Sequence, residues 1–240
     1  GTTFSNAFCP APVCAPARHS LATGLHPIDH GVLTNNHEPT RPLRTLGHLA
    51  MEHGIEPVQM GPMSWRGNWD TGFGPQLARQ EVWKSTLSPR SRRVYEAEAS
   101  NYIRRTTGGP SPRRSEEYWC QAVATSATES LARFADTGDR FLLWCSIPEP
   151  HPPFRPPADL YRTNLLADFE AWSGDEESSH PYVSGLRDEW RHLTRVEWRQ
   201  LASAYRGMVD LADTFVGQVI DAIAAHGLAD STGIILTADH

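Results

Sequence analysis

The chain has 240 residues, a formal net charge of −6 and 39% hydrophobic residues. This length can bury a substantial core, and no apolar run approaches the roughly 18 residues that a membrane-spanning helix needs. The charge is spread without a basic block, which argues against nucleic acid as a partner. The four cysteines show neither a zinc-site spacing nor a disulfide framework, so the cellular compartment stays open.

The first part of the chain predicts short strands and helices in alternation. Residues 2–8 alternate apolar and polar side chains, which predicts a strand. Residues 16–23 predict a helix that begins with a proline and ends before Gly24. A second helix is expected over residues 45–53, followed by a short strand over residues 55–61.

The second part predicts longer elements. Residues 115–137 predict a helix with Ser115 as its N-cap, and the apolar run 140–147 predicts a buried strand. Residues 196–226 carry apolar side chains on one face at helical spacing, which predicts a long helix. Residues 233–237 predict a further buried strand.

Strands that alternate with helices predict an α/β fold, with a mixed, largely parallel sheet sandwiched by helices. We interpret residues 1–240 as a fragment of one catalytic domain, incomplete at both ends, because residue 1 is not methionine and both ends are strand-like. Loop-rich insertions are expected over about residues 62–114 and 159–195. Sites in parallel sheets gather at the carboxyl ends of the strands, which draws attention to the residues after Ile147 and Thr237.

The motif Cys14-Ala-Pro-Ala-Arg18, followed by Thr23-Gly24, lies at the start of a predicted helix. Unpaired N–H groups and the positive end of the helix dipole favour an anion at this position. Arg18, one turn further on, can stabilise a deprotonated nucleophile and a bound oxyanion. This motif resembles the signature of the sulfatase family, within the alkaline-phosphatase-like superfamily.

The resemblance implies that Cys14 is converted to formylglycine by a formylglycine-generating enzyme. In that family the hydrated aldehyde attacks the sulfur of a sulfate ester, so the resemblance makes Cys14 the nucleophile and Arg18 its stabilising partner. Ala17 departs from the serine that the family most often has there, but the minimal pattern is intact.

A second motif, Pro-Glu-Pro-His-Pro-Pro-Phe over residues 148–154, resembles the Pro-His-x-Pro-Phe segment of the same family. Read alone, it predicts a polyproline loop. The resemblance implies that His151 contacts the sulfate and protonates the leaving oxygen, which an imidazole can do near neutral pH.

A third motif, Asp239-His240 after the predicted strand 233–237, resembles the family's metal-binding strand end. The resemblance implies that both residues ligate a divalent cation that neutralises the sulfate oxygens. Carboxylate oxygen suits calcium, the first expectation, or magnesium, while the imidazole nitrogen also admits manganese or zinc.

Two positions depart from the family pattern. Where the family has Gly-Lys-x-His, this chain has Gly61-Pro62-Met63-Ser64, and Arg66 is our hypothesis for the missing positive charge. The family's paired aspartates and a second lysine would lie outside residues 1–240. We therefore expect the fragment alone to bind metal poorly and to be nearly inactive.

The sequence thus predicts a formylglycine- and metal-dependent sulfatase that acts on a small-molecule or glycan sulfate ester. One alternative is a phosphonate monoester or phosphodiester hydrolase of the same superfamily, since both substrates present a tetrahedral anion. A second is a sulfatase-like anion-binding protein without turnover, suggested by Pro62 and Ser64. A thiol hydrolase using Cys14 has little support. The substrate, metal and oligomeric state stay open.

Overall fold

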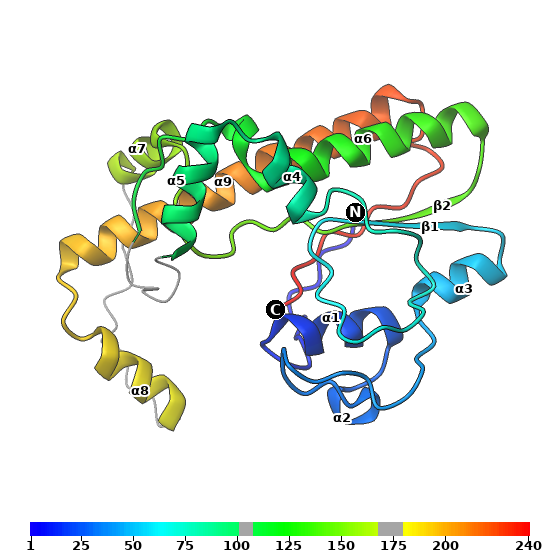
Figure 1. Ribbon diagram of the computed structural model, residues 1–240, viewed down its shortest axis with the longest axis horizontal. Coiled ribbons are helices and arrows are strands. Elements are labelled where there is room, and N and C mark those ends of the chain that lie inside the picture. Colours follow the sequence, from blue (N-terminus) through cyan, green and yellow to red (C-terminus); the bar gives the residue numbers. More distant parts are fainter. Residues whose placement is uncertain (101–107, 168–179) are drawn as a thin grey trace. The chain divides into compact units, whose positions relative to one another are not determined.

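The computed structural model describes residues 1–100, 108–167 and 180–240. The chain, drawn in Figure 1, forms two compact units. Unit 1 comprises residues 1–80, 123–146 and 219–240, and unit 2 comprises residues 81–122 and 147–218.

Unit 1 is built on a parallel pair of strands, β1 (Glu56–Met60) and β2 (Phe141–Cys145). Val58 lies opposite Leu143 in the register, and the two strands confirm those predicted over residues 55–61 and 140–147. A parallel pair requires a crossover connection, which explains why strands so distant in sequence are neighbours.

The strands predicted over residues 2–8 and 233–237 are wrong. Both segments are irregular, and Ile235 in the second is 91% exposed. An apolar or alternating pattern marks a face that would benefit from burial, but a strand also requires a partner for its backbone hydrogen bonds. Within the described residues, the sheet contains β1 and β2 alone.

Three helices precede or flank the sheet in unit 1: α1 (Cys14–Thr23), α2 (Pro27–His30) and α3 (Leu46–Glu52). The first ends at Gly24, which adopts a left-handed conformation with φ of 70°, as the sequence predicts. The third begins with Thr45 and His48 in a capping box, in which each side chain contacts the other residue's backbone N–H.

One face of the sheet, which includes Phe141 and Leu143, packs against two long helices. These are α6 (Trp119–Thr137), through residues 123–137, and α9 (Arg195–Ala225), through residues 219–225. Leu131 and Ile223 are buried at this contact, against Phe141 and Leu143. With α3 against β1, the small sheet has helices on both faces (Figure 1). This is the expected sandwich of helices around a parallel sheet.

The helix predicted over residues 115–137 is divided. Ser115–Glu117 forms one 3₁₀ turn, Tyr118 is extended, and α6 begins at Trp119. The N-cap position belongs to Arg114 rather than to Ser115, so that part of the prediction is wrong. The Tyr118 hydroxyl donates a hydrogen bond to the carbonyl of Arg155, and this contact in unit 2 accompanies the break.

Unit 2 is helical in the residues that the structure describes. It contains α4 (Gln80–Thr86), α5 (Pro89–Ser100), α7 (Ala158–Leu166), α8 (Pro181–Trp190) and most of α9. Short helices therefore occupy much of the two segments expected to be loop-rich, although residues 101–107 and 168–179 lie outside the described part. Pro89 and Pro181 begin helices instead of breaking them, because proline fits the first helical turn.

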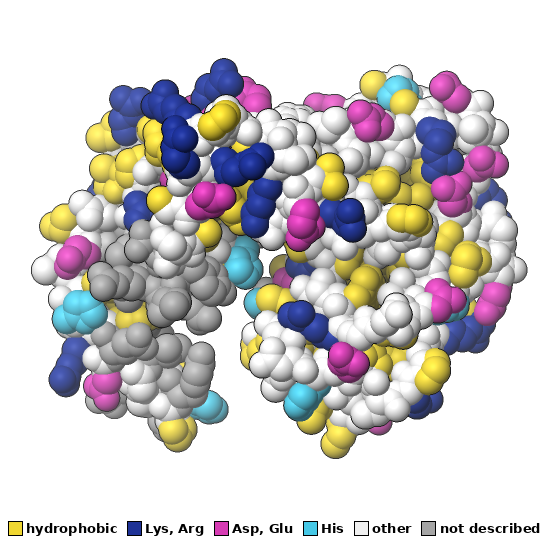
Figure 2. Space-filling model, viewed as in Figure 1, with side chains coloured by type: hydrophobic (Ala, Val, Ile, Leu, Met, Phe, Trp, Pro, Cys, Tyr) yellow, Lys and Arg dark blue, Asp and Glu magenta, His cyan; other side chains and the backbone are white. Residues whose placement is uncertain are grey.

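On the face drawn in Figure 2, Lys and Arg side chains gather over α4 and α5. The sequences of these helices contribute Lys84, Arg90, Arg92 and Arg93.

None of the described helices combines the length and the apolar character that a membrane-spanning helix requires.

Candidate active site

Cys14 is the first residue of α1, the position at which backbone N–H groups lack partners within a helix. The N-cap residue, Val13, offers no side-chain cap. Asn35 supplies one instead, because its Oδ1 accepts the N–H of Ala15 at 2.9 Å. The buried Ala15 and Ala17 pack α1 into unit 1 and hold Cys14 half-exposed at its start.

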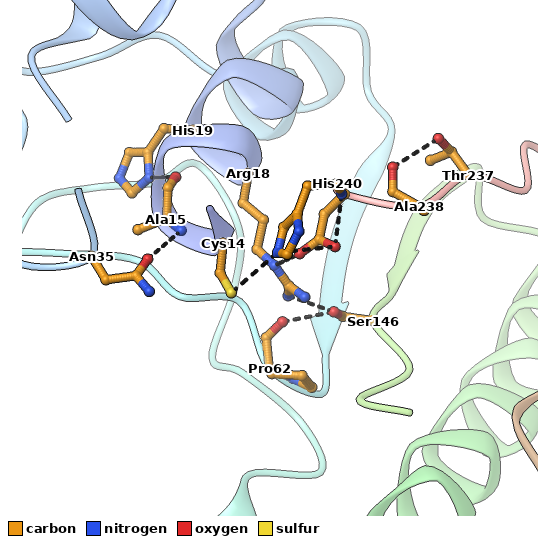
Figure 3. Close-up of polar contacts among 11 residues, drawn as sticks. Cys14, Ala15, Arg18, His19, Asn35, Pro62, Ser146, Thr237, Ala238 and His240 are labelled. Atoms are coloured by element: carbon orange, nitrogen blue, oxygen red, sulfur yellow. Dashed lines mark hydrogen bonds and ion pairs between the residues drawn. The ribbon is translucent and has the colours of Figure 1, made fainter. Parts of the chain in front are cut away.

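Four of the five predicted site residues meet at this helix start (Figure 3). The Sγ atom of Cys14 lies 3.4 Å from Nε2 of His240. Nε of Arg18 donates to Oδ2 of Asp239 at 2.7 Å, and these side chains are only 12% and 24% exposed. All four belong to unit 1, so the fold of that unit brings together residues more than 200 positions apart.

Ser146 is a site residue that the sequence reasoning missed. Its Oγ accepts a hydrogen bond from Nη1 of Arg18 at 2.7 Å and donates one to the carbonyl of Pro62, also at 2.7 Å. Arg18 is therefore fixed by two partners. The signal in the sequence was a serine at the carboxyl end of a buried apolar run, where strand ends place functional side chains.

Gly61 allows this arrangement. It adopts φ of 74°, and a Cβ atom there would lie 1.9 Å from the carbonyl oxygen of Ser146. Only glycine permits so close an approach. The N–H of Ser146 donates to the carbonyl of Met60 at 3.0 Å, so the ends of β1 and β2 are joined at the serine that binds Arg18.

The positions where the family has lysine and histidine contribute little side-chain chemistry here. Pro62 offers its carbonyl to Ser146, and Ser64 adopts a left-handed conformation with φ of 56°. Arg66 is within electrostatic reach of His19, whose ring points away from Arg18 and His240 (Figure 3). Cys14, Arg18, Asp239 and His240 are called the Cys14 cluster below. Among the described residues, the polar contacts of this cluster do not include Arg66.

His19 forms a buried polar and aromatic group on that other side of α1. Burial lowers the pKa of His19, and the charge of Arg66 lowers it further. Its Nδ1 donates to the carbonyl of Ala15 at 2.7 Å, and its ring lies edge-on to Trp65 at 5.2 Å. A neutral imidazole in this setting packs α1 against Trp65 and Trp69.

His151, the fifth predicted site residue, belongs to unit 2. It is exposed in the loop after β2. Its Nδ1 donates to the carbonyl of Pro152 at 2.8 Å, and its backbone N–H donates to the carbonyl of Pro148 at 3.1 Å. Because Nδ1 keeps a proton in this arrangement, Nε2 carries one only when the ring is an imidazolium.

Glu149, two residues before His151, is a second group that the sequence did not reveal. One of its carboxyl oxygens is buried without a hydrogen-bond partner, and the carboxyl shares a hydrogen bond with the thiol of Cys120. Burial raises the pKa of the Glu149 carboxyl. Burial also raises the pKa of the Cys120 thiol, far above its ordinary value, and the charge of Glu149 adds to this effect.

The Cys14 cluster fits a divalent cation in part. Ligand atoms of Cys14, Asp239 and His240 lie within 4.8 Å of one another, and Oδ1 of Asp239 is 3.9 Å from Nε2 of His240. Arg18 occupies only the other oxygen, Oδ2. One carboxylate and one imidazole are suitable first ligands, although calcium takes about six to eight oxygens and would need further donors.

The Sulfatase family model matches residues 1–240, the whole chain. A curated protein described as a sulfatase, from Formosa agariphila, is 26% identical over 270 residues, an alignment that covers 100% of this chain and 52% of that protein. The chain thus spans about half the length of this relative.

Solved structures show the same fold. The phosphonate monoester hydrolase of Agrobacterium radiobacter superposes with a TM-score of 0.70 and 22% identity, over 93% of this chain and 52% of that one. A 2-O GAG sulfatase superposes with a TM-score of 0.57 and 18% identity, over 92% of this chain and 46% of that one. The alkaline-phosphatase/sulfatase-like fold class predicted from the sequence is therefore confirmed.

Proposed function

Because this chain belongs to the sulfatase family, we propose that the whole protein hydrolyses sulfate esters with a formylglycine nucleophile derived from Cys14. The observation that carries the proposal is the convergence of Arg18, Asp239 and His240 on Cys14 at the start of α1. Residues 1–240 are proposed to be part of a single catalytic domain.

The nucleophile position lies where negative charge is favoured. Once converted, residue 14 supplies a hydrated aldehyde, whose oxygen is the group that attacks sulfur. Residue 14 is the first residue of α1, so it lies at the positive end of the helix dipole. Arg18, held by Asp239 and Ser146, directs a fixed positive charge at it, and a preorganised charge needs no rearrangement as the reaction proceeds.

Asp239 and His240 are the proposed metal ligands, through Oδ1 and Nε2. A divalent cation bound there supplies a Lewis acid for the sulfate oxygens. Calcium is our first candidate, with magnesium or manganese as alternatives. Arg18 binds Oδ2 of Asp239, whereas Oδ1 lies 3.9 Å from Nε2 of His240, and this supports Oδ1 and Nε2 as the metal ligands.

His151 is the proposed general acid, on the strength of its Pro-His-x-Pro-Phe motif. Its Nδ1 proton is engaged by the carbonyl of Pro152. The proton available to a leaving alcohol is therefore the Nε2 proton of the imidazolium form, and the neutral ring that remains keeps the same hydrogen bond.

A phosphonate monoester or phosphodiester hydrolase is the second candidate. It is favoured by the TM-score of 0.70 with the Agrobacterium phosphonate monoester hydrolase. Sulfate and phosphonate esters present similar tetrahedral anions to Arg18 and the metal, so the charge of the site does not separate them. A binding protein without turnover remains the third candidate, because Pro62 and Ser64 lack the family's side chains.

The test uses full-length protein produced together with a formylglycine-generating enzyme. The measurement is kcat/KM on an aryl sulfate and on the matching aryl phosphonate monoester, with added calcium, magnesium or manganese. Preference for the sulfate supports the proposal, and preference for the phosphonate supports the second candidate. Cys14→Ala should abolish either activity, whereas Cys9→Ala, at an exposed cysteine outside the site, should not.

If residue 14 is fully converted and neither ester is hydrolysed, the third candidate stands. Binding of inorganic sulfate, measured by calorimetry, would then be expected to survive in the same preparation. If the aryl sulfate is hydrolysed, small-molecule and glycan sulfate esters are the next substrates to assay.

A further inference from the structure

The Cys14 cluster contains different chemistry before and after modification. As encoded, it brings together a thiol, an imidazole and a carboxylate, which are the sulfur, nitrogen and oxygen donors found at protein zinc sites. We propose that, while Cys14 keeps its thiol, Cys14, Asp239 and His240 form a zinc site. Conversion of Cys14 then removes the sulfur ligand and turns the site towards oxygen-preferring cations.

The separation of sulfur and nitrogen already suits zinc. With Zn–S and Zn–N bonds of about 2.3 and 2.05 Å at a tetrahedral angle, the two ligand atoms would lie about 3.6 Å apart. The distance from Sγ of Cys14 to Nε2 of His240 is 3.4 Å. A zinc ion can therefore bind both atoms with a movement of a few tenths of an ångström.

Oδ1 of Asp239 is the proposed third ligand of the zinc ion. Arg18 holds Oδ2 at 2.7 Å, and the other oxygen, Oδ1, lies 3.9 Å from Nε2 of His240. Tetrahedral zinc would place these two atoms about 3.4 Å apart, which a small rotation of either side chain achieves. Oδ1 also accepts the backbone N–H of His240 at 3.0 Å, and a second lone pair remains for the metal.

The cluster is accessible to an ion. Cys14 and Asp239 are half-buried and His240 is exposed, so zinc can enter without opening the fold. Three protein ligands leave a fourth position for water, the arrangement of catalytic rather than structural zinc sites. Binding transfers the thiol proton to solvent and leaves a thiolate–zinc bond, with no change of oxidation state.

The other cysteines provide an internal contrast. Within the described residues, the one group of three or more candidate ligands lying within 4.8 Å of one another is the Cys14 group. Cys120 is buried beside Glu149, and burial raises the pKa of its thiol, so it is poorly suited to form a thiolate. Cys9 is exposed and serves as a matched control.

Modification would then change metal selectivity. Thiolate favours zinc, whereas the oxygen that replaces it favours calcium, magnesium or manganese. This second part rests on the proposed function, because it requires conversion of Cys14. The zinc site itself requires only the encoded thiol, so the two statements fail separately.

The test uses full-length protein made without a formylglycine-generating enzyme, with the free thiol verified by intact mass. Cobalt(II) is the spectroscopic probe, because thiolate-bound cobalt has a charge-transfer band in the near ultraviolet. The wild-type protein and Cys9→Ser should show this band, and zinc should displace it. Cys14→Ser should lack the band and bind zinc at least about 100-fold more weakly, because loss of an outer-shell partner alone costs roughly 10- to 100-fold.

Two results would overturn the proposal: cobalt binding to the wild type without the thiolate band, or equal zinc affinity in Cys14→Ser. Unchanged thermal unfolding of the metal-free variant shows that the substitution leaves the fold intact. Converted protein, measured in parallel, should bind cobalt without the band. Failure of conversion, seen by mass, would count against the proposed function and leave the zinc site standing.

Discussion

Two clusters in this molecule contain the same kinds of group in different surroundings. Each has a cysteine, a carboxylic acid and an arginine: Cys14, Asp239 and Arg18 in unit 1, and Cys120, Glu149 and Arg113 in unit 2. The first lies at an accessible helix start, and its arginine pairs with its acid. The second is buried, and its arginine pairs with Glu98 outside the cluster.

The difference shows that surroundings, rather than residue types, decide the chemistry. Burial raises the pKa of both Cys120 and Glu149, which share a hydrogen bond, so burial favours the neutral form of each group. A buried thiol with a raised pKa is poorly suited to form a thiolate. Cys14 and Asp239 retain access to solvent and a fixed guanidinium, which suits reaction and binding.

The largest effect is expected from removal of the buried arginine. Arg113→Ala should reduce the free energy of unfolding by about 3–5 kcal/mol, because Glu98 would be left buried and unpaired. The two side chains are only 6% and 11% exposed, and the guanidinium also stacks on Tyr118 at 3.9 Å. Chemical denaturation followed by tryptophan fluorescence measures this change.

Arg114→Ala is the matched control, because that neighbouring side chain is 79% exposed. It should change the free energy of unfolding by less than about 0.5 kcal/mol. Equal losses in the two variants would show that the Arg113–Glu98 pair is not the stabilising contact.

The next effect is on turnover. In the converted full-length protein, Arg18→Ala should lower kcat by about 10²- to 10³-fold, the cost of losing one preorganised donor. Arg18→Lys keeps the charge but cannot contact Asp239 and Ser146 as a fork, so its activity should be intermediate. Wild-type activity in Arg18→Lys would contradict a role for the guanidinium geometry.

Glu149 gives a pH-dependent effect with a defined sign. Because its folded pKa is raised, its stabilising contribution is present below the unfolded value of about 4.3 and is lost as pH rises through the folded pKa. Glu149→Gln does not titrate. Chemical denaturation over a pH series should therefore show the wild type losing stability relative to this variant as pH rises above about 4.3.

Glu117 is the control of opposite sign in the same unit. A hydrogen bond from Ser91 lowers the pKa of Glu117, so its contribution is present above about pH 4.3 and is lost as pH falls through the folded value. Glu117→Gln should therefore differ from the wild type mostly at neutral pH. For each variant, the quantity to compare is its difference in stability from the wild type as a function of pH. If this difference changed with pH in the same direction for both variants, the account of Glu149 would be refuted.

The smallest effect is expected at the surface of unit 1. Arg133 donates two hydrogen bonds to Glu56, but both side chains are nearly half exposed. Arg133→Ala should cost about 0.2–1 kcal/mol, and 1 M salt should remove most of that cost. A loss as large as that of Arg113→Ala would mean that exposure does not rank these arginine pairs.

The sequence predicted the parts of the fold that depend on local chemistry. The helix from Cys14 to Thr23 follows from Pro16 and Gly24, and the long helix α9 follows from its apolar face. The strand over residues 233–237 was wrong because a strand depends on a partner that the local pattern does not specify.

For the site, the motifs at the two ends of the chain predicted four residues, Cys14, Arg18, Asp239 and His240, that lie together in the structure. Ser146 was missed because a lone serine beside an apolar run has many uses. Glu149 was missed because an acid between prolines is typical of an exposed loop, and only the three-dimensional packing of unit 2 shows that its carboxyl is buried.

The central claim is that Cys14, placed at the start of α1 beside Arg18, is the residue that becomes the nucleophile. The most direct measurement is the mass of the peptide containing Cys14, from full-length protein produced with and without a formylglycine-generating enzyme. The account predicts that the thiol sulfur is exchanged for an aldehyde oxygen only when that enzyme is present. An unmodified thiol, under conditions that convert a known sulfatase, would contradict it.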